Sequence, residues 1–125
     1  MLTWYSYDHL DKYTIKEIFA EKKNKRTHIL CPLDLKSWFI GIGIPENQVT
    51  ECDWWDDLEV TRFPNAIDTS NPTVLEEALA SSNRKITISA VPAQHFSGRT
   101  GFDFNETLWA GWVVKSPDAS YYFAG

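Results

Sequence analysis

The sequence predicts an α/β fold with a mixed β-sheet. In the first half of the chain, a helical pattern stands between two short apolar segments, which is the order of a strand–helix–strand unit. In the second half, short apolar segments are separated by turn residues, an order typical of antiparallel strands and hairpins. With 125 residues, of which 43% are hydrophobic, the chain has the length and composition of one domain with a packed core.

The chain begins with an extended segment and a helix. Residues 1–7 form an apolar, aromatic run that we expect to be extended. Asp11 is placed to cap a helix that runs to about Lys23. The T-x-x-E pattern from Thr14 to Glu17 is that of a capping box. The sequence therefore predicts one strand followed by one helix in this part of the chain.

A second strand–helix unit follows, and then two more strands. Residues 27–31 (T-H-I-L-C) predict a short apolar strand that ends at Pro32. Asp34 is expected to begin a second helix, L-K-S-W-F-I, which ends at the glycines and proline of G-I-G-I-P. Residues 48–53 and 57–63 predict strands on either side of the turn W-W-D.

The second half of the chain supplies the remaining strands. Residues 85–91 (K-I-T-I-S-A-V) alternate between apolar and polar side chains and form the clearest strand of the sequence. Residues 108–114 and 120–124 predict a hairpin across K-S-P-D. The stretch before them, 64–84, begins as a polar segment and reads as an insertion within a single partial domain of residues 1–125.

Both ends of the predicted sheet suggest part of a larger fold. The first expected strand begins at Met1, with no element before it to cover the sheet. The last expected strand ends at Gly125, with no element after it. We therefore expect a domain truncated at both ends. Its exposed sheet edges would favour aggregation unless a partner covers them.

Charge and cysteine content exclude several classes of protein. The formal net charge is −5, and the only cluster of basic residues is Lys22, Lys23, Lys25 and Arg26. This balance argues against a nucleic-acid footprint over the whole surface, though not against a local anion site. Cys31 and Cys52 lie in separate segments without C-x-x-C spacing and are expected to be buried thiols. The sequence has neither a signal pattern nor an apolar run of bilayer length, which favours an intracellular compartment.

Three polar residues that bind metals well follow apolar strands: Asp8, His9 and His95. Strand ends are the usual position of sites in α/β folds. Carboxylate oxygen and imidazole nitrogen suit Zn²⁺, which they bind at about 2.0–2.2 Å. The alternative is that these side chains only hydrogen-bond the backbone of their own loops. His28 stands inside an apolar strand and is interpreted as a structural histidine.

Other side chains carry weaker functional hypotheses. Arg99 lies in the loop H-F-S-G-R-T, where its guanidinium could make a bidentate contact with a phosphate or simply pair with a carboxylate. Trp54 and Trp55 could mark a ligand-facing or lipid-facing edge. They could equally pack in the core with their indole N–H groups bonded nearby.

The polar segments occur in an order that resembles one family. There are five such segments, which in chain order are Y-D-H-L-D, V-T-E-C-D-W-W-D, V-P-A-Q-H-F-S-G-R-T, T-L-W-A-G-W-V-V and Y-Y-F-A-G. In this order they resemble the N-acyl-phosphatidylethanolamine-hydrolysing phospholipase D family, which has the metallo-β-lactamase fold. The resemblance covers most of the chain, and the stretch 64–84 has no counterpart in that family.

The resemblance implies an αββα sandwich with two zinc ions at the edge of the sheets. A bridging hydroxide would attack phosphorus and give phosphatidic acid and an N-acylethanolamine. Asp8 and His9 match the end of the family motif H-x-H-x-D-H and would hold the second metal, whereas His95 would hold the first. Residues of the same loop would contact the lipid phosphate: Gln94, Ser97 and Arg99. The resemblance also implies contact with a phospholipid substrate and association with a membrane surface or with mitochondria.

The chain departs from the family at its metal ligands. Trp4 and Ser6 stand where the first two histidines of the motif belong. Trp offers a metal no lone pair, and a serine hydroxyl is a poor zinc ligand. The family motif continues F-A-G-D, and its bridging Asp falls one position beyond Gly125. Because catalytic zinc usually has three protein ligands, we expect this chain alone to lack a complete metal site and to be inactive.

Other functions remain open at this point. A non-catalytic remnant could keep a lipid-binding or phosphate-binding surface around Arg99. A different hydrolase of the same fold, such as a lactonase-like enzyme acting on sugar phosphates, would carry related motifs. The sequence could also be an incomplete copy of a longer gene.

Overall fold

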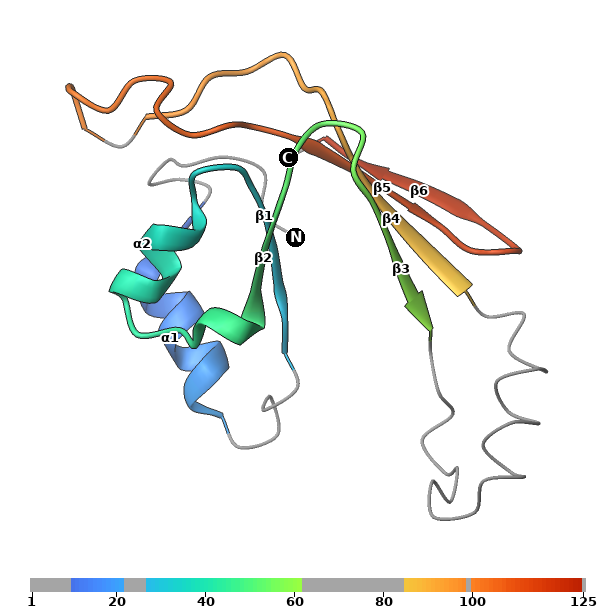
Figure 1. Cartoon of the computed structure of the whole chain (residues 1–125), viewed down its shortest axis with the longest axis horizontal. Coiled ribbons are helices and arrows are strands. Elements are labelled where there is room, and N and C mark those ends of the chain that lie inside the picture. The colour runs from blue at the N-terminus through green and yellow to red at the C-terminus, as the bar shows by residue number, and fades with distance from the viewer. Residues whose placement is uncertain (1–9, 22–26, 62–84, 99, 125) are drawn as a thin grey trace.

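The computed structural model describes residues 10–21, 27–61, 85–98 and 100–124 (Figure 1). Its helices and strands, in chain order, are α1 (Lys12–Ala20), β1 (Ile29–Pro32), α2 (Lys36–Gly41), the 3₁₀ turn η2 (Glu46–Gln48), β2 (Val49–Cys52), β3 (Asp57–Thr61), β4 (Lys85–Val91), β5 (Gly111–Lys115) and β6 (Ser120–Phe123). The expected extended segment 1–7 and the expected insertion 64–84 lie outside the described residues.

The described elements form three layers. β1 and β2 make a parallel two-stranded sheet, and β3, β4, β5 and β6 make an antiparallel sheet in that order. In Figure 1, α1 and α2 lie on one side of the β1–β2 pair, and the β3–β6 sheet lies on its other side. The predicted α/β class is confirmed, with parallel and antiparallel pairing in two separate sheets. One helical layer and two sheet layers agree with part of an αββα sandwich.

Two apolar cores lie on opposite faces of the β1–β2 pair. The first joins the helices to the sheet and contains Leu10, Ile29, Cys31, Leu35, Phe39, Ile44 and Val49. The second joins the pair to the β3–β6 sheet and contains Cys52, Ala90, Ala110 and Trp112, with Leu30 packed against them. Neighbouring residues of a strand point to opposite faces, so Leu30 and Cys31 enter different cores.

The first helix begins as predicted, but the second does not. The Asp11 carboxylate accepts a hydrogen bond from the Thr14 backbone N–H at 2.7 Å and caps α1. The suggested capping box from Thr14 to Glu17 is therefore one turn too late. Asp34 is not the cap of α2 either, because it has a left-handed φ of 66° and stands before Leu35, the N-cap residue.

A distant carboxylate supplies the missing cap of α2. The side chain of Glu51, in β2, accepts a hydrogen bond from the backbone N–H of Lys36 at 2.8 Å. This satisfies one of the N–H groups that a helix leaves unpaired at its first turn. Short-range sequence patterns could not show this contact, because the partners are fifteen positions apart.

The remaining boundaries differ only slightly from the prediction. β1 is Ile29–Pro32 rather than 27–31, so Pro32 is the last residue of the strand and not the residue after it. The final hairpin is confirmed, but β5 begins at Gly111 rather than at 108. The three residues 108–110 instead continue the loop that leads into the strand.

Candidate functional site

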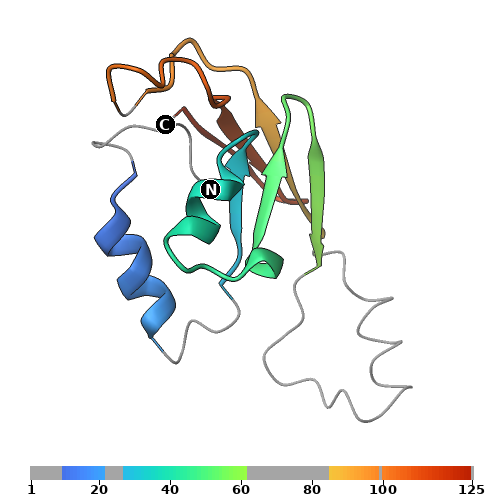
Figure 2. The ribbon, with the colours of Figure 1, turned by 60° about the vertical axis from the view of Figure 1, so that its left-hand side comes forward.

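One edge of the molecule collects the loops on which site residues were predicted. β1, β2 and β4 all end at this edge, which is uppermost in Figures 1 and 2. The β2–β3 turn (53–56) and the β4–β5 connection (92–110, without the undescribed residue 99) both lie along it. We call this the upper edge. It carries the D-W-W-D and P-A-Q-H segments.

His95 lies on this edge, four residues after β4 ends. Its ring is half-buried and is stacked on the ring of Phe96, with centroids 4.8 Å apart. Nδ1 is 2.7 Å from the backbone carbonyl oxygen of Phe96. A carbonyl oxygen can only accept, so Nδ1 is the protonated nitrogen, and the neutral ring carries its lone pair on Nε2. A backbone carbonyl that fixes the tautomer in this way is typical of metal-binding histidines.

Hydrogen bonds within the β4–β5 connection hold the His95 segment in place. Ser97 is fully buried, and its hydroxyl donates to the Thr107 carbonyl at 2.6 Å and accepts from the Thr107 N–H at 3.3 Å. Ser97 therefore ties the two sides of the loop together. Gln94 is exposed on the same loop, and Arg99 lies outside the described residues. The substrate contacts predicted for these three residues stay predictions.

Two tryptophans anchor the β4–β5 connection through their indole N–H groups. The Trp109 indole N–H donates to the carbonyl of Ala93 at 2.9 Å, and the Trp54 indole N–H donates to the carbonyl of Trp109 at 2.7 Å. Their rings meet edge to face, with centroids 6.1 Å apart. Sequence reasoning missed the role of Trp109, although its place just before β5 is the available signal. For Trp54, the core-packing interpretation holds.

Asp8 and His9, and the substituted positions Trp4 and Ser6, lie outside the described residues. Within the described ranges, no group of three or more His, Cys, Asp or Glu side chains could hold a metal ion. His95 is thus the one predicted ligand whose geometry is known, and the described residues do not by themselves form a zinc site.

His28 behaves as the structural histidine that the sequence suggested. Its side chain is exposed at the start of the segment that leads into β1, and Nε2 lies 2.8 Å from the Thr50 hydroxyl.

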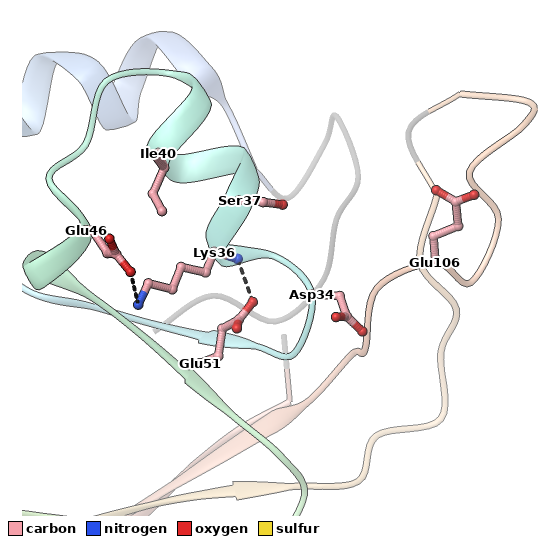
Figure 3. Close-up of a pocket in the computed structure, with 7 residues that line it drawn as sticks. All are labelled: Asp34, Lys36, Ser37, Ile40, Glu46, Glu51 and Glu106. Atoms are coloured by element: carbon pink, nitrogen blue, oxygen red, sulfur yellow. Dashed lines mark hydrogen bonds and ion pairs between the residues drawn. The ribbon is translucent and has the colours of Figure 1, made fainter.

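An open acidic cleft of about 680 Å³ lies beside α2 (Figure 3). Carboxylates dominate its lining, which comprises Asp34, Lys36, Ser37, Ile40, Glu46, Glu51 and Glu106. The ammonium group of Lys36 is 3.4 Å from a carboxylate oxygen of Glu46, so the one basic group is already paired. A phosphodiester would meet net negative charge here, which makes this cleft unsuitable for the phosphate of a lipid.

Comparison with known sequences defines the class of protein. Residues 2–125 match the family described as "Beta-lactamase superfamily domain". Because the match covers nearly the whole chain, the chain belongs to this family. The layered α/β fold and the position of His95 at a strand end agree with this assignment.

Similarity to individual proteins is consistent with the resemblance seen in the motifs. The chain is 32% identical over 122 residues to N-acyl-phosphatidylethanolamine-hydrolyzing phospholipase D 1 of Caenorhabditis elegans, covering 95% of this chain and 28% of that protein. It is 29% identical over 120 residues to an uncharacterized protein of Mycobacterium tuberculosis, covering 96% and 26%. It is 28% identical over 107 residues to the mitochondrial N-acyl-phosphatidylethanolamine-hydrolyzing phospholipase D of Saccharomyces cerevisiae, covering 86% and 18%. The chain thus spans less than a third of each relative.

The described helices are short. α1 has nine residues and α2 has six, and neither has the length and apolar character that crossing a membrane requires.

Proposed function

We propose that this chain is part of a hydrolase of the N-acyl-phosphatidylethanolamine-hydrolysing phospholipase D type. The observation that carries the proposal is the geometry of His95 within a chain of this family. The β4–β5 connection places the ring at the upper edge, and the Phe96 carbonyl accepts from Nδ1, an arrangement typical of metal-binding histidines. Similarity to two proteins named for this activity, over most of the chain, supports the same substrate class.

The proposal gives each candidate residue a role. His95 would bind the first zinc ion through Nε2, and Asp8 and His9 would bind the second. Arg99 would hold the phosphate of the lipid by a bidentate contact, with Gln94 beside it. Ser97, whose buried hydroxyl bonds both backbone groups of Thr107, would support this loop from within.

The proposal also includes a low activity for the chain alone. Trp4 and Ser6 occupy the two positions where the resembling family has histidines. With His95 as the one remaining ligand of the first metal, zinc would be held too weakly at that position for hydrolysis.

Restoring the two histidines tests the proposal. We expect the purified chain to retain little zinc after dialysis and to release no N-acylethanolamine from N-acylphosphatidylethanolamine. The double variant Trp4→His/Ser6→His should retain zinc, and His95→Ala in that background should remove it again. His28→Ala is the matched control, because His28 is exposed and bonds Thr50 rather than the predicted site.

Two results would contradict the proposal. If the unmodified chain retained one equivalent of zinc that His95→Ala abolished, the ligand count would be wrong. If the restored variant lost no zinc on the His95→Ala change, His95 would not be a ligand. Elemental analysis of dialysed protein measures both outcomes directly.

A further inference from the structure

The upper edge exposes four large aromatic side chains. Trp55 is 72% exposed, Phe96 51%, Phe102 96% and Phe104 62%. Trp55 belongs to the β2–β3 turn, and the three phenylalanines belong to the β4–β5 connection. We call these four residues the aromatic rim. Folding gains almost nothing from the Phe102 ring, because it remains as accessible to water as in an extended chain.

The phenylalanines are held outward by an ordered loop. The Asn105 N–H donates to the Ser97 carbonyl at 2.8 Å, and the Thr100 N–H donates to the Asp103 carboxylate at 2.6 Å. The Phe96 and Phe104 rings are stacked, with centroids 5.2 Å apart. The backbone hydrogen bonds thus fix the loop in a shape that presents apolar rings to the outside.

Trp55 is presented outward at a cost in backbone strain. Its φ is 76°, a left-handed value that bulky residues rarely adopt. The turn is held by the Trp55 N–H, which donates to the Ala90 carbonyl at 2.7 Å, and by the Asp53 N–H, which donates to the Asp56 carboxylate at 2.7 Å. Strain of this kind, of order 1–3 kcal/mol, persists where the surroundings impose it and is concentrated at functional positions.

The rim lies at the same edge as the candidate site. The β2–β3 turn and the β4–β5 connection run along the upper edge in both views of the ribbon (Figures 1 and 2). Phe96 also touches the His95 ring directly, through the stacked contact at 4.8 Å. Whatever covers the rim would therefore lie against the mouth of the proposed site.

We propose that the aromatic rim inserts into the interface of a phospholipid bilayer. This proposal rests on the proposed function. A hydrolase of membrane lipids must bring its site to the bilayer surface. Trp favours the headgroup level, and Phe side chains insert at the boundary between headgroups and acyl chains. In the sequence of the two rim-bearing segments, four acidic residues, Asp53, Asp56, Asp103 and Glu106, outnumber the one basic residue, Arg99. The rim therefore fits a zwitterionic surface better than an anionic one, and its binding to the bilayer relies on the apolar rings more than on charge.

Vesicle binding tests this surface without requiring activity. We expect the purified chain to cosediment with phosphatidylcholine vesicles, and to bind less when phosphatidylserine is added to them. Phe102→Ser and Trp55→Asn should each lower the partition coefficient about tenfold, the order expected for one exposed aromatic ring leaving an apolar environment. Asn tolerates the left-handed backbone of position 55.

The matched control is Tyr121→Thr. Tyr121 is 69% exposed, nearly as much as Trp55, but it lies on β6 opposite Val114, toward the far end of the hairpin from the upper edge. This substitution should leave vesicle binding unchanged. Near-ultraviolet circular dichroism of each variant verifies that its fold is retained.

The outcomes separate this inference from the proposed function. Absence of binding to phosphatidylcholine vesicles, or equal losses in Phe102→Ser and Tyr121→Thr, would overturn membrane docking. So would self-association in lipid-free buffer that Phe102→Ser abolishes, since the rim would then bind a second copy. If the rim binds vesicles while the histidine-restored variant retains no zinc, docking stands and the hydrolase proposal fails.

Discussion

Cys31 shows how burial controls the chemistry of a single side chain in this fold. The thiol is fully buried in the core between the helices and the β1–β2 pair. Burial, with a smaller contribution from the nearby Glu51 carboxylate, raises its pKa from 9.0 to about 12. Because the thiolate is the reactive form, Cys31 is expected to be inert to oxidation and alkylation while the chain is folded.

The raised pKa predicts a loss of stability in alkali. The unfolded thiol ionises near its ordinary pKa, whereas the folded one keeps its proton up to about pH 12. The folded state therefore binds more protons than the unfolded state in this range, and the free energy of unfolding should fall between about pH 9 and 12. Urea unfolding at pH 8 and pH 10 measures the effect.

Cys31→Ala provides the control for that prediction. The variant should lose a smaller part of its stability between the two pH values. A reduced dependence should remain, because burial also raises the pKa of the Cys52 thiol to about 11. An unchanged pH dependence in Cys31→Ala would show that other groups cause the alkaline loss.

Single residues also show what a sequence can and cannot reveal. Asp11 was recognised as a helix cap because its partner, the Thr14 N–H, is three positions away. Asp34 stands in a similar local pattern, yet its left-handed backbone removes it from the capping position. Glu51 caps that helix from another strand, and a contact of this kind depends on the tertiary fold.

At the scale of elements, the β4–β5 connection depends on the pair Trp54 and Trp109. Trp109→Phe would keep most of the apolar contact but remove the hydrogen bond to the Ala93 carbonyl. We expect a loss of about 1 kcal/mol in the free energy of unfolding and faster amide hydrogen exchange in residues 94–98.

A Trp-to-Phe substitution in the helical core separates a local effect on the β4–β5 connection from a general loss of stability. Trp38 is half-buried in the helical core, where its ring meets Phe39 edge to face at 5.0 Å. Trp38→Phe is expected to leave exchange in the β4–β5 connection unchanged. Equal exchange rates in the two variants would contradict an anchoring role for Trp109.

Strands and hairpins were the most predictable elements because their signals are local. Alternation of apolar and polar residues defined β4 with its exact bounds, and K-S-P-D defined the β5–β6 turn. The W-W-D turn was also expected. What could not be foreseen is the difference between its two tryptophans, since Trp54 turns inward to Trp109 while a positive φ turns Trp55 outward.

For the whole molecule, the outer strand of the larger sheet predicts association. β6 pairs with β5, and no other described strand pairs with it. Its side chains remain open to solvent, with Tyr121 69%, Tyr122 61% and Phe123 52% exposed. An exposed aromatic edge strand offers unpaired backbone groups to another chain. We expect the apparent mass in light scattering to increase with protein concentration.

A charged side chain on β6 should prevent this association. Tyr121→Lys is expected to keep the chain monomeric at concentrations where the unmodified chain associates, because charged edge strands resist pairing. Phe102→Ser, which changes the aromatic rim and leaves β6 unaltered, should not have this effect. A monomer at all concentrations without any substitution would show that β6 is already protected.

The family and the overall fold could thus be predicted from the order of motifs, whereas the candidate site was only partly accessible. His95 was proposed as a metal ligand from its motif, and the structure added the hydrogen bond between its Nδ1 and the Phe96 carbonyl. The aromatic rim was not foreseen, since it arises from two segments that the fold brings to one edge.

The β1–β2 pair has a consequence for how the molecule comes apart. The β1–β2 pair lies between the two cores and has one thiol on each face, Cys31 against the helices and Cys52 against the β3–β6 sheet. Departure of the helices would uncover the first thiol, and departure of the larger sheet would uncover the second. The two cysteines are therefore built-in reporters, and the order in which a thiol reagent reaches them records which layer detaches first.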